Sequence, residues 1–250
     1  LQIAIKDKLY SLSPDLVIST YENNSRGIAS EKINNFASVS SEIKNVFPVI
    51  RFEKLIEKPT LISVDNSFET VIFRGVNNGY NFRDFNKFII GSKIKNDITN
   101  NEIIISKSLS DKLKISVGQI LTLYFQVNNN QRIPNVRSFN VSYIYETDFP
   151  DYDNNYIIGN LEILQNVYKW SKNDYANIEI SIEDKSQISL IEKSISLLSS
   201  FEKNNLSTKT VQSKYTNIFS WISIFDFNIL IITFLMILVA IISVVISLFI

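Results

Sequence analysis

The sequence ends in a long, uninterrupted apolar segment. Residues Ile229–Ile250 read ILIITFLMILVAIISVVISLFI, with no charged side chain and with Thr233, Ser243 and Ser247 as the polar interruptions. As a helix rising about 1.5 Å per residue, the segment would reach roughly 33 Å, and a bilayer's hydrocarbon core is about 30 Å thick. The alternative is a buried core helix, but such helices rarely stay apolar on every side for so long. We therefore expect a transmembrane helix over residues 229–250.

Aromatic residues precede this segment. Residues 214–228 contain Phe219, Trp221, Phe225 and Phe227. Aromatic side chains with amphipathic edges favour the boundary between membrane and water, so this stretch predicts a membrane-interface segment. No lysine or arginine flanks the far end of the apolar segment, and charge therefore does not indicate its orientation.

The first residues, 1–14, have the pattern of an amphipathic helix. Leu1, Ile5, Leu9 and Leu12 are spaced about one helical turn apart, and charged residues lie off this stripe. The segment lacks the charged start and the cleavage site of a signal peptide. Two interpretations stay open: the helix continues from an earlier transmembrane helix, or it is a free amphipathic start.

The composition excludes several classes of function. The chain has 25 basic and 25 acidic residues, and this zero net charge gives no basic excess for capturing nucleic acid. It contains neither cysteine nor histidine. Disulfides, thiol nucleophiles, imidazole-based catalytic triads and cysteine- or histidine-ligated zinc sites are therefore excluded. We expect no cofactor.

Two strand–helix–strand patterns lie far apart in the sequence. The first has strands at 15–20 and 49–56 around a helix at 30–46, with Ser30 as its expected N-cap. The second has strands at 177–182 and 206–212 around a helix at 185–203. Together they predict an α+β fold with a split ferredoxin-like porter domain formed by residues 15–69 and 171–213.

Between these halves, residues 70–170 form a strand-rich insertion. Strands are expected at 71–76, 102–106, 119–127 and 138–145, with a short helix over 106–113. Gly118 is expected to supply a positive φ in the turn that follows this helix. We predict an inserted, mainly antiparallel β subdomain.

No motif for catalysis emerges. The six glycines never form the GxxxxGK[ST] pattern of a phosphate-binding loop. Asp148, Asp151 and Asp153 could bind Ca²⁺, but they lack the spacing and central glycine of an EF-hand, which favours a solvated turn. A pair of carboxylates for glycoside hydrolysis has no positive support.

Three stretches resemble FtsX-like ABC-transporter permeases, most closely the lipoprotein-releasing, Lol-type permease subunits. The stretches are Glu102–Phe125 (EIIISKSLSDKLKISVGQILTLYF), Arg132–Asp153 (RIPNVRSFNVSYIYETDFPDYD) and Phe219–Val245 (FSWISIFDFNILIITFLMILVAIISVV). With the N-terminal helix, the resemblance covers nearly the whole chain. The departures from the family pattern weaken assignment to one subfamily: Ser110 replaces Ala, Gln119 replaces Asp, and Tyr143 and Asp148 replace Gly.

The resemblance implies a non-catalytic membrane subunit of the bacterial inner membrane, with residues before about 228 in the periplasm. It implies four transmembrane helices in the complete subunit, one before Leu1 and two after Ile250. The implied partners are a cytoplasmic ABC ATPase that hydrolyses ATP, a second permease subunit in a dimer, a periplasmic lipoprotein carrier and the lipoprotein cargo. The implied mechanism is mechanical coupling.

In one type of Lol permease, a proline-containing hairpin binds the carrier. The matching loop here is 127–137, with Arg132, Ile133, Pro134 and Asn135 as candidate carrier-binding residues. An ordinary hairpin loop is the alternative. Three other functions are open for the whole chain: a division scaffold of the FtsX type that activates a cell-wall hydrolase, a permease that exports macrolides or peptides, and an anchored hydrolase.

Overall fold

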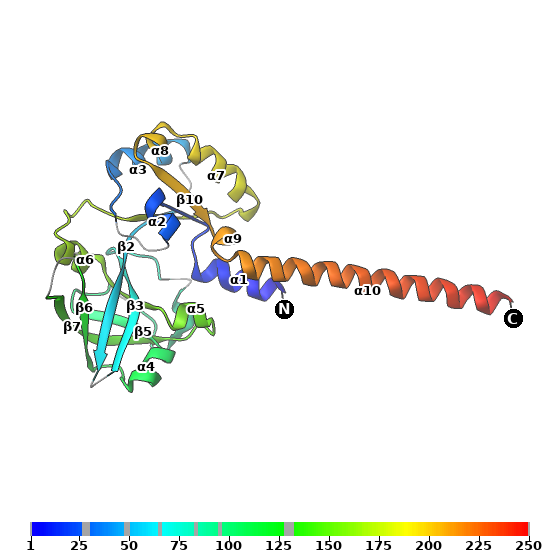
Figure 1. Ribbon diagram of the computed structural model, residues 1–250, viewed down its shortest axis with the longest axis horizontal. Coiled ribbons are helices and arrows are strands. Elements are labelled where there is room, and N and C mark those ends of the chain that lie inside the picture. Colours follow the sequence, from blue (N-terminus) through cyan, green and yellow to red (C-terminus); the bar gives the residue numbers. More distant parts are fainter. Residues whose placement is uncertain are drawn as a thin grey trace.

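The protein consists of a mixed α+β body from which one long helix projects (Figure 1). The computed structural model describes residues 2–26, 31–47, 51–64, 67–82, 85–94, 97–127 and 133–249. The helices are α1 (Gln2–Leu12), α2 (Tyr21–Arg26), α3 (Phe36–Val46), α4 (Lys107–Leu113), α5 (Pro150–Asp153), α6 (Leu161–Tyr168), α7 (Ile188–Ser196), α8 (Ser199–Lys203), α9 (Val211–Lys214) and α10 (Thr216–Phe249), with 3₁₀ turns at Phe85–Phe88 and Lys185–Gln187. The strands are β1 (Leu16–Thr20), β2 (Arg51–Val64), β3 (Ser67–Val76), β4 (Ile89–Ile90), β5 (Glu102–Ser106), β6 (Ile120–Phe125), β7 (Asn135–Tyr145), β8 (Tyr156–Asn160), β9 (Asn177–Ser181) and β10 (Leu206–Thr210).

One part of the body is an antiparallel sheet in the order β10–β1–β9–β2, built from both ends of the chain. Alternation along the strands gives this sheet two different faces. One face is apolar and packs on α3, α7 and α8, with Leu16, Ile18, Ile178 and Ile180 fully buried. The opposite face carries polar side chains. We call this part the α/β unit.

The second part is a closed ring of six strands. β2 pairs with β3, β3 with β8, β8 with β5, β5 with β7, β7 with β6, and β6 pairs back with β2. The pairs β3–β8 and β5–β7 are parallel and the other four are antiparallel, so the barrel is mainly antiparallel. Closure removes free strand edges from this part of the sheet. We call it the barrel.

The two parts share β2. Its first residues, Arg51–Leu55, pair with β9 of the α/β unit, and Leu61–Ser63 pair with β6 of the barrel. The division predicted between residues 69 and 70 falls inside β3, beyond this shared strand. A continuous strand of 14 residues therefore connects the two parts directly.

Several predicted boundaries are wrong. The helix predicted over 30–46 begins at Phe36, after Asn35 in a left-handed conformation with φ of 50°; Ser30 lies outside the described residues. The helix predicted over 185–203 is broken, because Leu198 is extended. An unbroken helix would turn Phe201 roughly 120° away from Ile195, whereas both side chains are buried in one core. The strand predicted over 206–212 ends at Thr210, where α9 follows.

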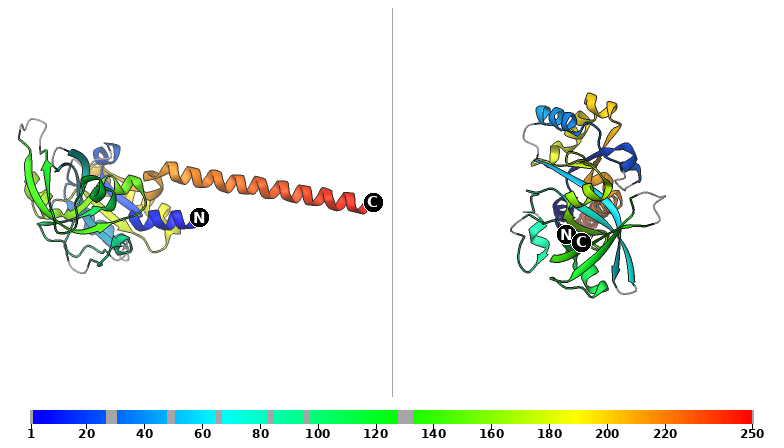
Figure 2. Two further views of the ribbon diagram at one scale, coloured as in Figure 1. Left: turned by 90° about the horizontal axis from the view of Figure 1, so that it is seen from below. Right: turned by 90° about the vertical axis from the view of Figure 1, so that its left-hand side faces the viewer.

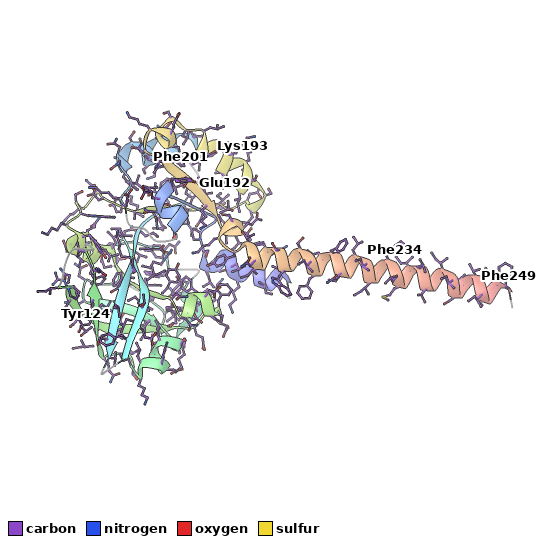
Figure 3. The ribbon with its side chains drawn as sticks, in the orientation of Figure 1. Tyr124, Glu192, Lys193, Phe201, Phe234 and Phe249 are labelled. Carbon is purple, nitrogen blue, oxygen red and sulfur yellow. The ribbon has the colours of Figure 1, made fainter. Side chains whose placement is uncertain are left out.

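The predicted interface segment and the predicted span form one continuous helix. α10 has 34 residues, with a most apolar window of mean hydropathy 3.4 and no part of that window buried. From residue 223 to residue 249 its side chains are exposed, including Phe234 and Phe249 (Figure 3). This exposure contradicts the alternative of a buried core helix. By length and composition, α10 is able to cross a membrane.

Substitution of Gly159 tests the packing inside the barrel. This glycine pairs with Gly75 across β8 and β3, and a Cβ atom built on Gly159 would lie 2.4 Å from the ring of Phe73. Phe73 cannot move away cheaply, because it is fully buried against Phe125 and Phe139, with ring centroids 5.6 and 5.8 Å away. We expect Gly159→Ala to lower the free energy of unfolding by about 1–3 kcal/mol. Chemical denaturation of the detergent-solubilised chain measures this, with the exposed Ser138→Ala as control. Equal stability of both variants would contradict the packing described.

Lys58 provides a test by pH. Burial lowers its pKa to about 8 from 10.5. The folded chain therefore releases this proton before the unfolded chain does, and stability should rise from pH 8 upward. The rise should end near pH 10, where unfolded tyrosines ionise while burial raises the pKa of Tyr168 to about 12. Unfolding measurements should show a gain on the order of 1 kcal/mol between about pH 7 and 9. Lys58→Met should abolish the gain and exposed Lys193→Met should keep it; a gain retained in Lys58→Met would refute this assignment.

Candidate functional site at the base of the long helix

The first helix and the long helix meet at one side of the body. α1 lies beside the start of α10, and both point away from the body in the same direction (Figures 1 and 2). The rings of Tyr10 and Phe219 meet edge to face with centroids 6.3 Å apart. The hydroxyls of Ser13 and Tyr215 are 3.1 Å apart and share a hydrogen bond. We call the region formed by residues 10–15 and 211–219 the stalk base.

The stalk base is fixed to the α/β unit by a buried carboxylate. Asp15, 1% exposed, accepts hydrogen bonds from the backbone N–H of Ile182 at 2.6 Å and from Lys185 Nζ at 2.6 Å. The backbone carbonyl of Asp15 accepts from the N–H of Val211, at the start of α9, at 3.2 Å. Charge-assisted hydrogen bonds of this kind are among the stronger ones in proteins. One residue therefore joins the end of α1, the approach to α10 and the strand β9.

α1 and the stalk base also contact the barrel side of the body. Lys8 forms an ion pair with Asp148 at 3.1 Å, and Lys87 donates to the hydroxyl of Ser11. The rings of Phe149 and Tyr215 meet edge to face with centroids 5.6 Å apart. A displacement of α1 or α10 would therefore reach both parts of the body.

A buried arginine joins the α/β unit to the barrel. Arg74 of β3 donates from Nη1 to Glu57 of β2 at 2.6 Å and from Nη2 to both carboxylate oxygens of Glu179 of β9 at 2.6 Å. Burial opposes the charge on Arg74, but Glu179 and other neighbours hold the pKa of Arg74 well above its usual value. The three side chains form a charged bridge between the two sheets.

The carboxylates singled out as a possible Ca²⁺ site do not converge. Asp153 is buried and accepts from the hydroxyl of Thr147 at 2.6 Å, while Asp148 pairs with Lys8. Within the described part of the chain, no three Asp or Glu residues are arranged to hold a metal ion.

The predicted carrier-binding residues lie at the hairpin between β6 and β7. Arg132 falls outside the described residues. Ile133 is 78% exposed and Pro134 is exposed, whereas Asn135 begins β7 and pairs with Phe125. Tyr124, on β6 of this hairpin, lies on the side of the body opposite to α10 (Figure 3). Carrier binding by these residues stays a prediction.

The predicted interface aromatics all lie in α10, but they do not have one environment. Trp221, Phe225 and Phe227 are exposed, and the rings of Trp221 and Phe225 are 6.4 Å apart. Phe219 is instead half-buried against α1, through its contact with Tyr10. Phe219 therefore belongs to the stalk base.

Sequence reasoning missed the charged bridge. Arg74 follows an apolar run within a strand, which is a signal that its charge must be compensated inside the fold. Glu179 alternates with Ile178 and Ile180, a pattern that predicts a solvent-facing carboxylate. Its actual partner is 105 residues away, and nothing local in the sequence indicates it.

Comparisons with known proteins reveal relatives by structure. No family model and no curated protein sequence matches the chain. Among solved structures, the periplasmic region of MacB from Actinobacillus actinomycetemcomitans is similar with a TM-score of 0.52 and 16% identity, over 81% of this chain and 91% of that one. The extracellular domain of the noncanonical ABC-type transporter YknZ from Gram-positive bacteria gives a TM-score of 0.49 and 17% identity, over 78% of this chain and 99% of that one. The chain shares the fold of the periplasmic region of MacB.

The charged bridge makes a prediction about stability. Arg74→Met should lower the free energy of unfolding by about 3–5 kcal/mol, because it leaves buried Glu179 without a partner. Arg74→Met combined with Glu179→Leu should lose markedly less, since the unpaired charge is gone. Denaturant unfolding of the two variants measures the difference. A double variant as unstable as the single one would show that the bridge does not act as described.

Proposed function

We propose that this chain is the extracytoplasmic domain, with its following transmembrane helix, of an FtsX-like ABC-transporter permease subunit. One observation carries the proposal: α1 and α10 lie in contact and leave the body on the same side (Figure 2). If α1 continues from a transmembrane helix, a body held in this way would be tethered to one membrane surface at both ends. The fold shared with the periplasmic region of MacB and the three sequence stretches described above support the same assignment.

The proposed role is mechanical. A separate cytoplasmic ATPase would displace the transmembrane helices, and the stalk base would pass this displacement to the α/β unit and, through Arg74, to the barrel. A second permease subunit would complete the dimer. The strand order β10–β1–β9–β2 supports the split ferredoxin-like porter assignment. The membrane would be the bacterial inner membrane, with residues before about 228 in the periplasm.

The more specific proposal is lipoprotein release of the Lol type. In this proposal the hairpin at 127–137 binds the soluble periplasmic carrier that receives the lipoprotein. The exposure of Ile133 and Pro134, away from the membrane helix, supports it, because a carrier arriving from the periplasm would meet this side of the body freely.

A second candidate is a permease that exports macrolides or peptides. The fold shared with the periplasmic region of MacB is compatible with this candidate. The long inserted subdomain argues against a division scaffold of the FtsX type, whose extracytoplasmic domain is generally smaller. The identity of the partner captured at the hairpin distinguishes lipoprotein release, export and the division scaffold.

The test replaces Pro134 with a photoreactive amino acid in the membrane-embedded chain. We expect irradiation to cross-link a soluble lipoprotein carrier from Pro134 and not from Leu197, which is 77% exposed on the α/β unit and serves as the control. Capture of a periplasmic adaptor would support the export permease instead, and capture of a cell-wall hydrolase would support the division scaffold. Equal capture from both positions would contradict a specific hairpin site.

A further inference from the structure

The polar face of the α/β sheet borders a cavity beside the stalk base. The cavity has a volume of about 160 Å³ and lies between this face and the barrel residues Arg74 and Tyr156. Its walls include side chains from β1, β9, β10 and α9. A water occupies about 10–15 Å³ of such volume, so the space holds a group of several heavy atoms.

One wall of the cavity contains a buried amide without a partner. Asn177 is only 5% exposed, and its side chain makes no hydrogen bond to any described residue. Its backbone is held in register between Ser19 of β1 and Leu55 of β2, so the amide cannot readily turn away. Because the side chain lines the cavity, its amide atoms are accessible from that space. An amide without an intramolecular partner is available there to a ligand or to ordered water.

Two lysines line the same cavity without a carboxylate partner. Lys209 of β10 and Lys214 of α9 form no ion pair with a described residue. The ammonium of Lys214 instead lies over the rings of Tyr156 and Tyr215, 5.7 and 5.4 Å from their centroids. The hydrogen-bond donors that line the cavity therefore come from three elements, β9, β10 and α9.

The two carboxylates in the cavity wall form no ion pair with these lysines, although the charge of Glu57 helps to raise the pKa of Lys214. Both oxygens of Glu179 accept from Arg74, and Glu57 accepts from the other arm of the same guanidinium. With Arg74, Lys209 and Lys214 against Glu57 and Glu179, the cations outnumber the carboxylates by three to two. The cavity thus carries excess positive charge and unpaired hydrogen-bond donors.

We propose that this cavity binds a small oxyanion, a carboxylate or a phosphate, held by Lys209, Lys214 and the amide of Asn177. Ammonium and amide N–H groups are the donors that such anions accept. A bound anion would connect β9 with β10 and α9, directly beside the start of α10. Occupancy would thereby stiffen the stalk base.

Isothermal titration calorimetry of the full, detergent-solubilised chain tests the site with inorganic phosphate and, separately, with acetate. We expect saturable binding of at least one anion. Lys209→Gln and Asn177→Ser should each weaken it by about tenfold or more, because each removes a direct donor. Lys203→Gln, an exposed position in α8, is the matched control and should bind as the unmodified chain does. Binding of only one anion identifies the chemistry.

Three results would overturn the proposal: no saturable binding of either anion, binding by Lys209→Gln at unchanged affinity, or equal weakening by Lys203→Gln. Circular dichroism of each variant verifies folding. Lys209 is only half-buried, so its variant provides a decisive answer even where Asn177→Ser fails to fold.

Discussion

The architecture depends on the ion pairs of the Arg74 guanidinium with Glu57 and Glu179. The guanidinium comes from a strand of the barrel, and it binds carboxylates from β2 and β9 at 2.6 Å, with Arg74 and Glu179 both buried. Buried charges such as those of Arg74 and Glu179 are costly unless each has a partner with good geometry. The barrel therefore cannot separate from the α/β unit without exposing or orphaning one of these charges. Together with the shared strand β2, this bridge makes the body behave as one piece.

The same reasoning extends to the membrane side. Asp15 fixes the end of α1 to β9 through Ile182 and Lys185, and its backbone holds the start of α9. The aromatic contacts of Tyr215 and Phe219 then connect α10 to α1 and to the barrel. These contacts lead from the long helix to β9, the strand that carries Glu179 of the charged bridge. The proposed mechanical role needs such an arrangement.

Features encoded locally could be predicted from the sequence. The apolar segment of α10, the short helix α4 and the positive φ of Gly118 all follow from neighbouring residues. Features that depend on pairing between residues far apart in the sequence could not be predicted. The closure of the barrel requires Leu61 of β2 to pair with Tyr124 of β6, and no local pattern specifies that partner. The partners of Arg74 and the cavity beside Asn177 could not be predicted either. Polar residues that alternate with apolar ones in a strand indicate solvent exposure by default.

Double electron–electron resonance between α10 and the barrel tests the central claim of rigid coupling most directly. The chain has no cysteine, so spin labels at Phe225→Cys and Ile120→Cys would be the only ones. Both positions are exposed. The account predicts one narrow distance distribution in lipid nanodiscs, which broadens when Tyr10 and Tyr215 are both replaced by alanine. A broad distribution in the otherwise unmodified chain would show that the long helix moves independently of the body, and would contradict the account.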